Sequence, residues 1–285
     1  MIYVTHGIIA SYRSERISHA LCLPASRAQL HLQLRRKKYV PLAQAIAGGG
    51  DALTVDDATY AGLEMALLAR RYGHAVSWFV NGSHVENRNE YFPFQISAML
   101  DDTRATECGF DGQTWSLKTT ADRRTLRAII KHRYMQMRSL GEITQLIDKL
   151  ADSVRCDSKD AESSLRTVGT AHLAQAVLAG VDLQNHGWSH LNPQVLSEEE
   201  RAAEVMRNDE YLSQFRRTVT QVCAPPFGHC VMPVPPEYFV VLANRGLSPS
   251  YREGNTLNRT DLVLTATSRN KRDRISRAEK ARLAA

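Results

Sequence analysis

Short apolar segments alternate with stretches of helical character in the first third of the chain. Residues 2–5, 52–55 and 75–82 are apolar runs of strand length. Residues 24–39 carry apolar side chains on one helical stripe, and residues 62–73 form a second helical segment that a glycine ends. This order of strands and helices predicts a parallel sheet covered by helices.

The alternation stops in the middle of the chain. Residues 125–154 show long helical periodicity, and residues 112–117 suit at most a short extended piece or hairpin. We therefore expect residues 85–167 to be a mainly helical insertion that could act as a lid. Residues 1–84 and 168–267 would then form the two parts of one α/β domain.

A strand-and-helix alternation returns after the insertion. The predicted elements are a helix at 170–180, a strand at 181–186, a helix at 197–215, a strand at 220–228, a helix at 235–246 and strands at 248–251 and 262–267. Ser197, followed by three glutamates, is typical of a capped helix start. No internal repeat interrupts this pattern.

The apolar and charged fractions of the 285 residues are typical of a soluble protein. No run approaches the roughly 18 apolar residues of a membrane span, and the first residues lack the pattern of a secretory signal. Five scattered cysteines, never spaced as CxxC, suit reduced thiols, so we expect a cytoplasmic protein.

The net charge of +6 belongs mainly to the end of the chain. Residues 268–285 hold seven Lys and Arg against one Asp and one Glu, which leaves the other residues near +1. We expect this basic tail to be a solvated terminus. Nucleic-acid binding through it is the last of the functional hypotheses.

Three predicted strands end in residues that can carry chemistry. These ends are Asp56–Asp57, residues 185–190 (NHGWSH) and residues 224–228 (APPFG). In parallel α/β sheets and barrels, functional sites form where the carboxyl ends of several strands converge.

A metal ion would explain these residues together. His186 and His190, spaced i and i+4, can bind one cation from the same side, and Asp57 would complete a set of two histidines and one carboxylate. Asp56 would stay free as a base beside a bound water. Each motif alone is also typical of a capped turn or of packing histidines, and their joint occurrence at strand ends favours the metal.

The three motifs resemble those of the NodB-homology polysaccharide deacetylases, carbohydrate esterase family four. TVDDA (residues 54–58) resembles their TFDDG, NHGWSH their Asn-His-x-x-x-His, and APPFG their RPPYG. The resemblance implies a deformed (β/α) barrel that removes acetyl groups from sugars with a divalent metal, usually zinc, with cobalt, nickel or manganese as alternatives.

Residue roles carry over from the same resemblance. It implies that Asp56 is the base and that Asp57, His186 and His190 are the metal ligands. The turn Pro225, Pro226, Phe227 and Gly228 would form the groove wall, with the Phe227 N–H binding the oxyanion.

Two positions depart from the family pattern. Ala224 replaces an arginine that orients the base, and Arg252 or Arg259 could substitute for it. The last family motif, Leu-x-His, supplies the general acid, but residues 262–267 contain no histidine. His229 and His84 are the candidate acids, although a lone loop histidine is commonly structural.

Aromatic residues of the insertion have two possible roles. Tyr91, Phe92 and Trp115 could contact a sugar ring, but we expect them to form the core of a helical subdomain. The segment 90–100 is also compatible with a crossing over the barrel mouth.

The sequence therefore predicts a metal-dependent N-deacetylase acting on an acetylated amino sugar or on a biosynthetic intermediate that contains one. A hydrolase of a non-sugar amide, such as a cyclic imide or ureide, is an alternative on the same scaffold. The missing acid histidine also leaves open a non-catalytic, glycan-binding member. The sequence makes no prediction of oligomeric state.

Overall fold

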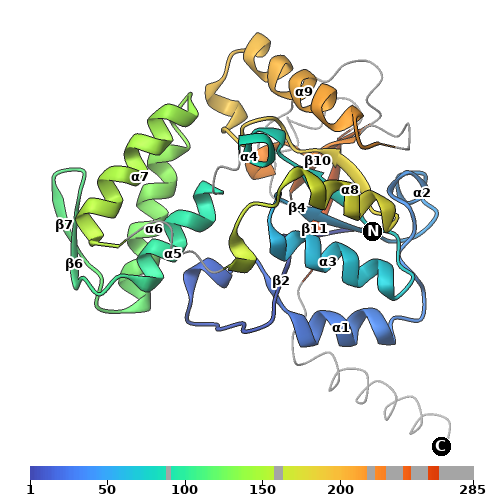
Figure 1. The fold of residues 1–285 in the computed structure, drawn as a ribbon, viewed down its shortest axis with the longest axis horizontal. Helices are drawn as coiled ribbons and strands as arrows, with labels where there is room; N and C mark the ends of the chain where they lie inside the picture. The colour runs from blue at the N-terminus through green and yellow to red at the C-terminus, as the bar shows by residue number, and fades with distance from the viewer. Residues whose placement is uncertain (88–90, 157–162, 217–221, 229–239, 245–255, 263–285) are drawn as a thin grey trace, which may run out of the picture.

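The computed structural model describes residues 1–87, 91–156, 163–216, 222–228, 240–244 and 256–262, with side chains of 240–244 and 256–261 left aside. Figure 1 shows a barrel with helices around it and the insertion at one side. Among the described residues, no helix has the length and apolar character that crossing a membrane requires.

Seven parallel strands close into the barrel. They are β1 (Ile2–Thr5), β4 (Ala52–Asp56), β5 (Ser77–Val80), β8 (Asp182–Asn185), β9 (Val222–Cys223), β10 (Val240–Asn244) and β11 (Thr256–Asp261). Their order is β1-β11-β10-β9-β8-β5-β4, and β4 pairs back onto β1. The predicted deformed (β/α) barrel is confirmed, and its parallel order brings all carboxyl strand ends to one mouth.

Helices cover the outside of the barrel. They are α1 (Ala25–Leu34), α2 (Leu42–Ile46), α3 (Tyr60–Arg71), α8 (Thr170–Leu178) and α9 (Glu198–Ser213), with the short strand pair β2 (Ile8–Ile9) and β3 (Leu23–Pro24) beside α3. Thr59 caps α3. Ser197 caps α9 in a capping box with Glu200, as its sequence predicts.

The insertion has its own hydrophobic core. It contains α5 (Phe92–Asp102), the hairpin β6 (Glu107–Phe110) and β7 (Gln113–Ser116), α6 (Thr120–Tyr134) and α7 (Leu140–Val154), whereas the short helix α4 (Gly82–Asn87) before it packs Val85 in the core of the barrel. Leu126, Ile130 and Leu150 are buried inside it, together with Leu191 and Leu196 from the loop after β8. The insertion therefore packs on the loops at the barrel mouth.

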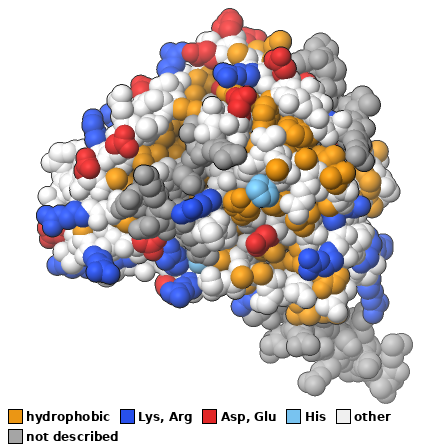
Figure 2. All heavy atoms as spheres, viewed as in Figure 1, with side chains coloured by type: hydrophobic (Ala, Val, Ile, Leu, Met, Phe, Trp, Pro, Cys, Tyr) orange, Lys and Arg blue, Asp and Glu red, His pale blue; other side chains and the backbone are white. Residues whose placement is uncertain are grey.

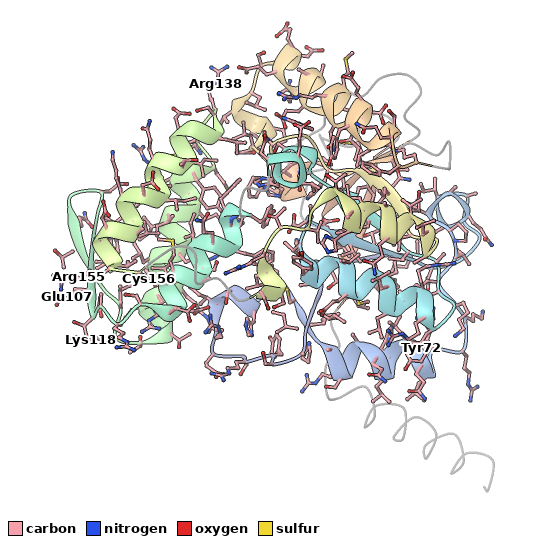
Figure 3. All side chains as sticks on the ribbon, in the orientation of Figure 1. Tyr72, Glu107, Lys118, Arg138, Arg155 and Cys156 are labelled. Atoms are coloured by element: carbon pink, nitrogen blue, oxygen red, sulfur yellow. The ribbon has the colours of Figure 1, made fainter. Side chains whose placement is uncertain are left out.

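An ion pair also connects the insertion to the barrel's outer layer. Arg138 lies at the end of the insertion nearest α9 (Figure 3) and places its Nη2 2.6 Å from Glu200 Oε2.

On the face drawn in Figure 2, Lys and Arg side chains are scattered among Asp and Glu. Among the described residues on this face, the basic side chains form no continuous patch of the kind that nucleic-acid binding uses.

One C-terminal prediction is wrong in the described residues. The helix predicted at 235–246 contains strand β10 at 240–244, because a short apolar run is ambiguous between helix and strand and pairing with β9 and β11 decides. β11 ends at Asp261, and the predicted strand 262–267 lies outside the described residues except for Leu262. The predicted strand 248–251 lies outside the described residues.

The first predicted helix is also shorter than expected. α1 ends at Leu34, and Arg35 is extended. The Arg35 guanidinium pairs with Asp51 and lies 4.1 Å from the centre of the Tyr39 ring. These contacts bring the chain back toward the barrel in place of a further helical turn.

Candidate metal and catalytic site

The candidate site residues follow neighbouring strands at the barrel mouth. Asp56 is the last residue of β4 and Asp57 follows it, whereas His186 follows β8 directly. Ala224 and the turn 225–228 follow β9, which pairs with β8. The strand order therefore brings segments more than a hundred residues apart to one place.

Backbone conformation at the site is unusual. Asp57, His190 and Phe227 have φ values of 71°, 57° and 62°, in the left-handed region. Such a conformation costs a residue with a side chain about 1–3 kcal/mol and is concentrated at functional sites. The indole Nε1 of Trp78 stabilises the turn by donating to the Asp57 carbonyl over 2.7 Å.

Buried hydrogen bonds hold the loop that carries both histidines. Asn81 Nδ2 donates to the carbonyl oxygen of His186 at 2.7 Å. The backbone N–H and the hydroxyl of Ser189 both donate to the Glu204 carboxylate, each over 2.8 Å. The loop is thus positioned by α9 and by the end of β5.

The structure brings together the three predicted metal ligands. Asp57 Oδ1 lies 3.4 Å from His186 Nε2 and 3.5 Å from His190 Nε2. One ligand atom from each of the three residues lies within 4.8 Å of the others, and all three side chains are buried. In the part of the chain that the structure describes, this is the one group of three or more His, Cys, Asp and Glu residues so arranged.

Electrostatics favour an ionised carboxylate and a neutral imidazole. Burial alone raises the pKa of Asp57, but a hydrogen bond with His186 and the charges of nearby histidines outweigh it and hold that pKa well below its usual range. Burial lowers the pKa of His190 far below its usual value, against the opposing effect of Asp57. Both are the protonation states that bind metals.

The orientation of His186 fits a metal as well. Its Nδ1 lies 2.6 Å from the carbonyl oxygen of Ala224, which can only accept, so Nδ1 carries the proton. Nε2 faces Asp57 Oδ1, and a metal ion bound by both atoms would take the place of the hydrogen bond between them. A backbone carbonyl as partner of the distal nitrogen is the usual arrangement of a metal-bound histidine.

The spacing of the donor atoms is also suitable. A tetrahedral ion with bonds of about 2.1 Å separates its ligand atoms by about 3.4 Å. The two separations from Asp57 Oδ1 agree with that value. The residues present therefore fit a divalent cation such as zinc.

Asp56 and the groove turn complete the predicted set. Asp56 is buried, and its charge contributes to raising the pKa of Tyr91, after burial and the larger effect of Asp57. The Phe227 ring lies edge-on to the His190 ring, with centroids 4.8 Å apart. The Gly228 N–H donates to the Pro225 carbonyl.

Of the candidate acids and the arginines that could orient the base, the structure describes the side chain of His84 alone. His84 is 2% exposed, with its Nε2 3.3 Å from the Ser189 carbonyl oxygen and its ring against Tyr91. His229 and Arg252 lie outside the described residues. Arg259 is on β11, and its side chain is among those left aside.

Sequence reasoning missed two residues at the site. Tyr91 is buried, but in a cluster with Ile9 and Ala61 of the barrel part and not in the helical core where we expected it, and its hydroxyl lies 2.7 Å from Asp57 Oδ1 and 2.5 Å from His190 Nε2. His6 follows β1 at the same mouth, and its charge acts on both Asp57 and His190. Its position directly after a predicted strand was an available signal for His6, whereas Tyr91 had none beyond the segment's suggested crossing.

Fold and site together define the class of protein. The chain is a parallel (β/α) barrel with a buried aspartate and two histidines that could hold a metal at its mouth. Residues 51–234, well over half of the chain, match the sequence profile of the family described as polysaccharide deacetylase. The chain therefore belongs to the polysaccharide deacetylase family, and this membership supports deacetylase activity.

Solved structures give a more distant similarity. The Streptococcus pyogenes deacetylase PplD in complex with acetate is 11% identical, with a TM-score of 0.55 over 93% of this chain and 92% of that chain. A de-N-acetylase from Aggregatibacter actinomycetemcomitans is 10% identical, with a TM-score of 0.49 over 95% and 98%. The first of these supports the fold. No curated protein matches this chain significantly.

Proposed function

We propose that the protein is a metal-dependent N-deacetylase of an acetylated amino sugar or of a biosynthetic intermediate that contains one. The observation that carries the proposal is the convergence of Asp57, His186 and His190 on one buried point. Asp56, the last residue of β4, directly precedes Asp57 in the sequence. Family membership supplies the reaction class.

A divalent ion held by Asp57, His186 and His190, with zinc the first candidate and cobalt, nickel or manganese the others, would polarise the acetyl carbonyl and increase the acidity of a water. Asp56 is the proposed base that removes the proton of this water during its attack on the carbonyl carbon. The Phe227 N–H is the proposed donor to the carbonyl oxygen, where negative charge develops.

The departing nitrogen needs a proton, because an amide anion is too basic to leave. We propose His6 for this step, because it is only half-buried and follows β1, the strand that pairs with β4 at the same mouth. The earlier candidate His84 is enclosed, with the Tyr91 ring against it. His229 stays a candidate from the sequence.

An amino-sugar substrate suits the surroundings of the site. The partly exposed Phe227 ring lies edge-on to His190 with centroids 4.8 Å apart, whereas Phe92 is buried in the core of the insertion. Aromatic surfaces of this kind bind the apolar faces of sugar rings. A cyclic imide or ureide would use the same catalytic groups, so both substrate classes belong in the assay.

Activity and metal content test the proposal together. Purified protein should hold about one divalent ion per chain and release acetate from N-acetylated amino sugars. Asp56→Asn should abolish turnover and retain the metal, whereas Asp148→Asn, on the exposed face of α7, should change neither.

Three other results would each contradict part of the proposal. Absence of bound metal would remove the metal-dependent mechanism. Turnover of cyclic amides alone would favour the second substrate class. Full metal occupancy with ligand binding but no product would favour a glycan-binding protein.

A further inference from the structure

The Tyr91 hydroxyl lies among the atoms that would face the metal. Its oxygen is 2.7 Å from Asp57 Oδ1, to which it donates, and 2.5 Å from His190 Nε2. Those are the same two atoms that lie 3.5 Å from each other in the candidate ligand set. A hydroxyl in this position should therefore affect the affinity of the site for a cation.

These distances restrict where an ion can be relative to Tyr91. An ion bound to both Asp57 Oδ1 and His190 Nε2 at bond lengths of about 2.1 Å would lie at most about 3 Å from the Tyr91 oxygen, on whichever side it enters. An oxygen at that limit is not bonded to the ion, but a shift of about 1 Å would bring it to bonding distance.

Packing opposes displacement. The Tyr91 side chain is 3% exposed. Its ring contacts those of Phe92, Phe94 and His84, with centroids 5.9, 5.4 and 5.4 Å away. Tyr91 is also the residue before α5, and its carbonyl oxygen accepts hydrogen bonds from the backbone N–H groups of Phe94 and Gln95 in the first turn of that helix. A movement large enough to empty the site would disturb this aromatic cluster.

We propose that the Tyr91 oxygen is a fourth protein ligand of the metal, supplied by the insertion. This inference rests on the proposed metal site. Tyrosine oxygen is an established ligand of protein-bound iron, and the phenol proton would be released to solvent on binding, as for other acidic ligands. Metal binding would then join the insertion to the barrel, and an ion of higher coordination number would still accept water or substrate.

Spectroscopy of the metal distinguishes Tyr91 from a neighbour. Wild-type protein loaded with Cu²⁺ or Fe³⁺ should show a phenolate-to-metal charge-transfer band in the visible range. Tyr91→Phe should lose this band and weaken Zn²⁺ binding in chelator competition by about 10- to 100-fold. The matched control is Tyr134→Phe, a buried tyrosine whose ring contacts Phe92 5.2 Å away. It should keep both the band and the affinity.

The remaining outcomes separate this inference from the proposed function. If wild-type protein binds metal, Asp57→Ala loses it, and Tyr91→Phe changes neither band nor affinity, Tyr91 is not a ligand and the metal site stands. Tighter Zn²⁺ binding by Tyr91→Phe would show that the hydroxyl competes with the ion, which also overturns the inference. If the folded wild-type protein binds no metal, both proposals fail.

Discussion

The indole nitrogen of Trp78, on β5, holds the backbone carbonyl of Asp57, after β4, through a buried hydrogen bond of 2.7 Å. Trp78 is fully buried, and Asp57 has a left-handed φ of 71°. A core side chain of one strand thus fixes the backbone that directs a candidate metal ligand from the next. Stability and metal binding should therefore be linked here.

Trp78→Phe should reduce both the stability of the protein and its affinity for the metal. It removes the hydrogen bond and leaves a small cavity, so we expect a loss of about 2–4 kcal/mol in the free energy of unfolding. Zn²⁺ affinity should fall, as chelator competition would measure. Trp115→Phe is the matched control, because it removes an indole bond to the Phe110 carbonyl inside the insertion. An equal loss of Zn²⁺ affinity in both variants would contradict the link.

His6→Gln should impair amide hydrolysis selectively. A proton donor matters for a poor leaving group, so acetate release from an N-acetyl sugar should fall by about 10²- to 10⁴-fold. Hydrolysis of an activated aryl acetate ester, whose phenolate leaves unaided, should change little, and metal content should stay the same. If His84→Gln or His229→Gln shows this selective loss instead, the acid is that residue and not His6.

Asn208 should be one of the most sensitive polar positions. Its amide donates to the Val80 carbonyl and Asn185 Oδ1, and its oxygen accepts from the Gly82 N–H, all within 2.9 Å and fully buried. Asn208→Ala would leave several buried groups without partners and should cost about 3 kcal/mol in urea unfolding. Asn87→Ala, which removes one bond at an exposed side chain, should cost less than about 1 kcal/mol. Similar losses would contradict this role.

His74 should make the protein less stable in acid. Its Nδ1 accepts from the Tyr39 N–H and its Nε2 donates to the Leu32 carbonyl, an arrangement that requires the neutral ring. Burial lowers the pKa of His74, and the Lys38 charge lowers it further, against the raising effect of the bond to Leu32.

The direction of the pH dependence follows from this shift. The unfolded chain binds the proton near pH 6.5, whereas the folded protein does so only at lower pH, so the free energy of unfolding falls as the pH decreases from about 6.5. Urea unfolding at several pH values should show a smaller slope for His74→Gln than for the wild type. The exposed His132→Gln should keep the wild-type slope, and an unchanged slope in His74→Gln would refute the assignment.

Local patterns were sufficient for much of the fold. The strand at 52–55 and the helix started by Ser197 were predictable, because buried strands and capped helices have short-range signals. The run at 240–244 was not, because an apolar segment of that length suits either element until neighbouring strands pair with it.

The site divides in a similar way. Asp57, His186 and His190 could be predicted, because each follows a strand that had its own signal, and their proximity then follows from parallel strand order. The sequence by itself determined the barrel class, the family motifs and these three residues. His6, directly after the predicted strand 2–5, had the same signal. Only the tertiary structure decided that Tyr91 reaches Asp57 and His190, because packing of the insertion places a side chain there that no local pattern brings to the site.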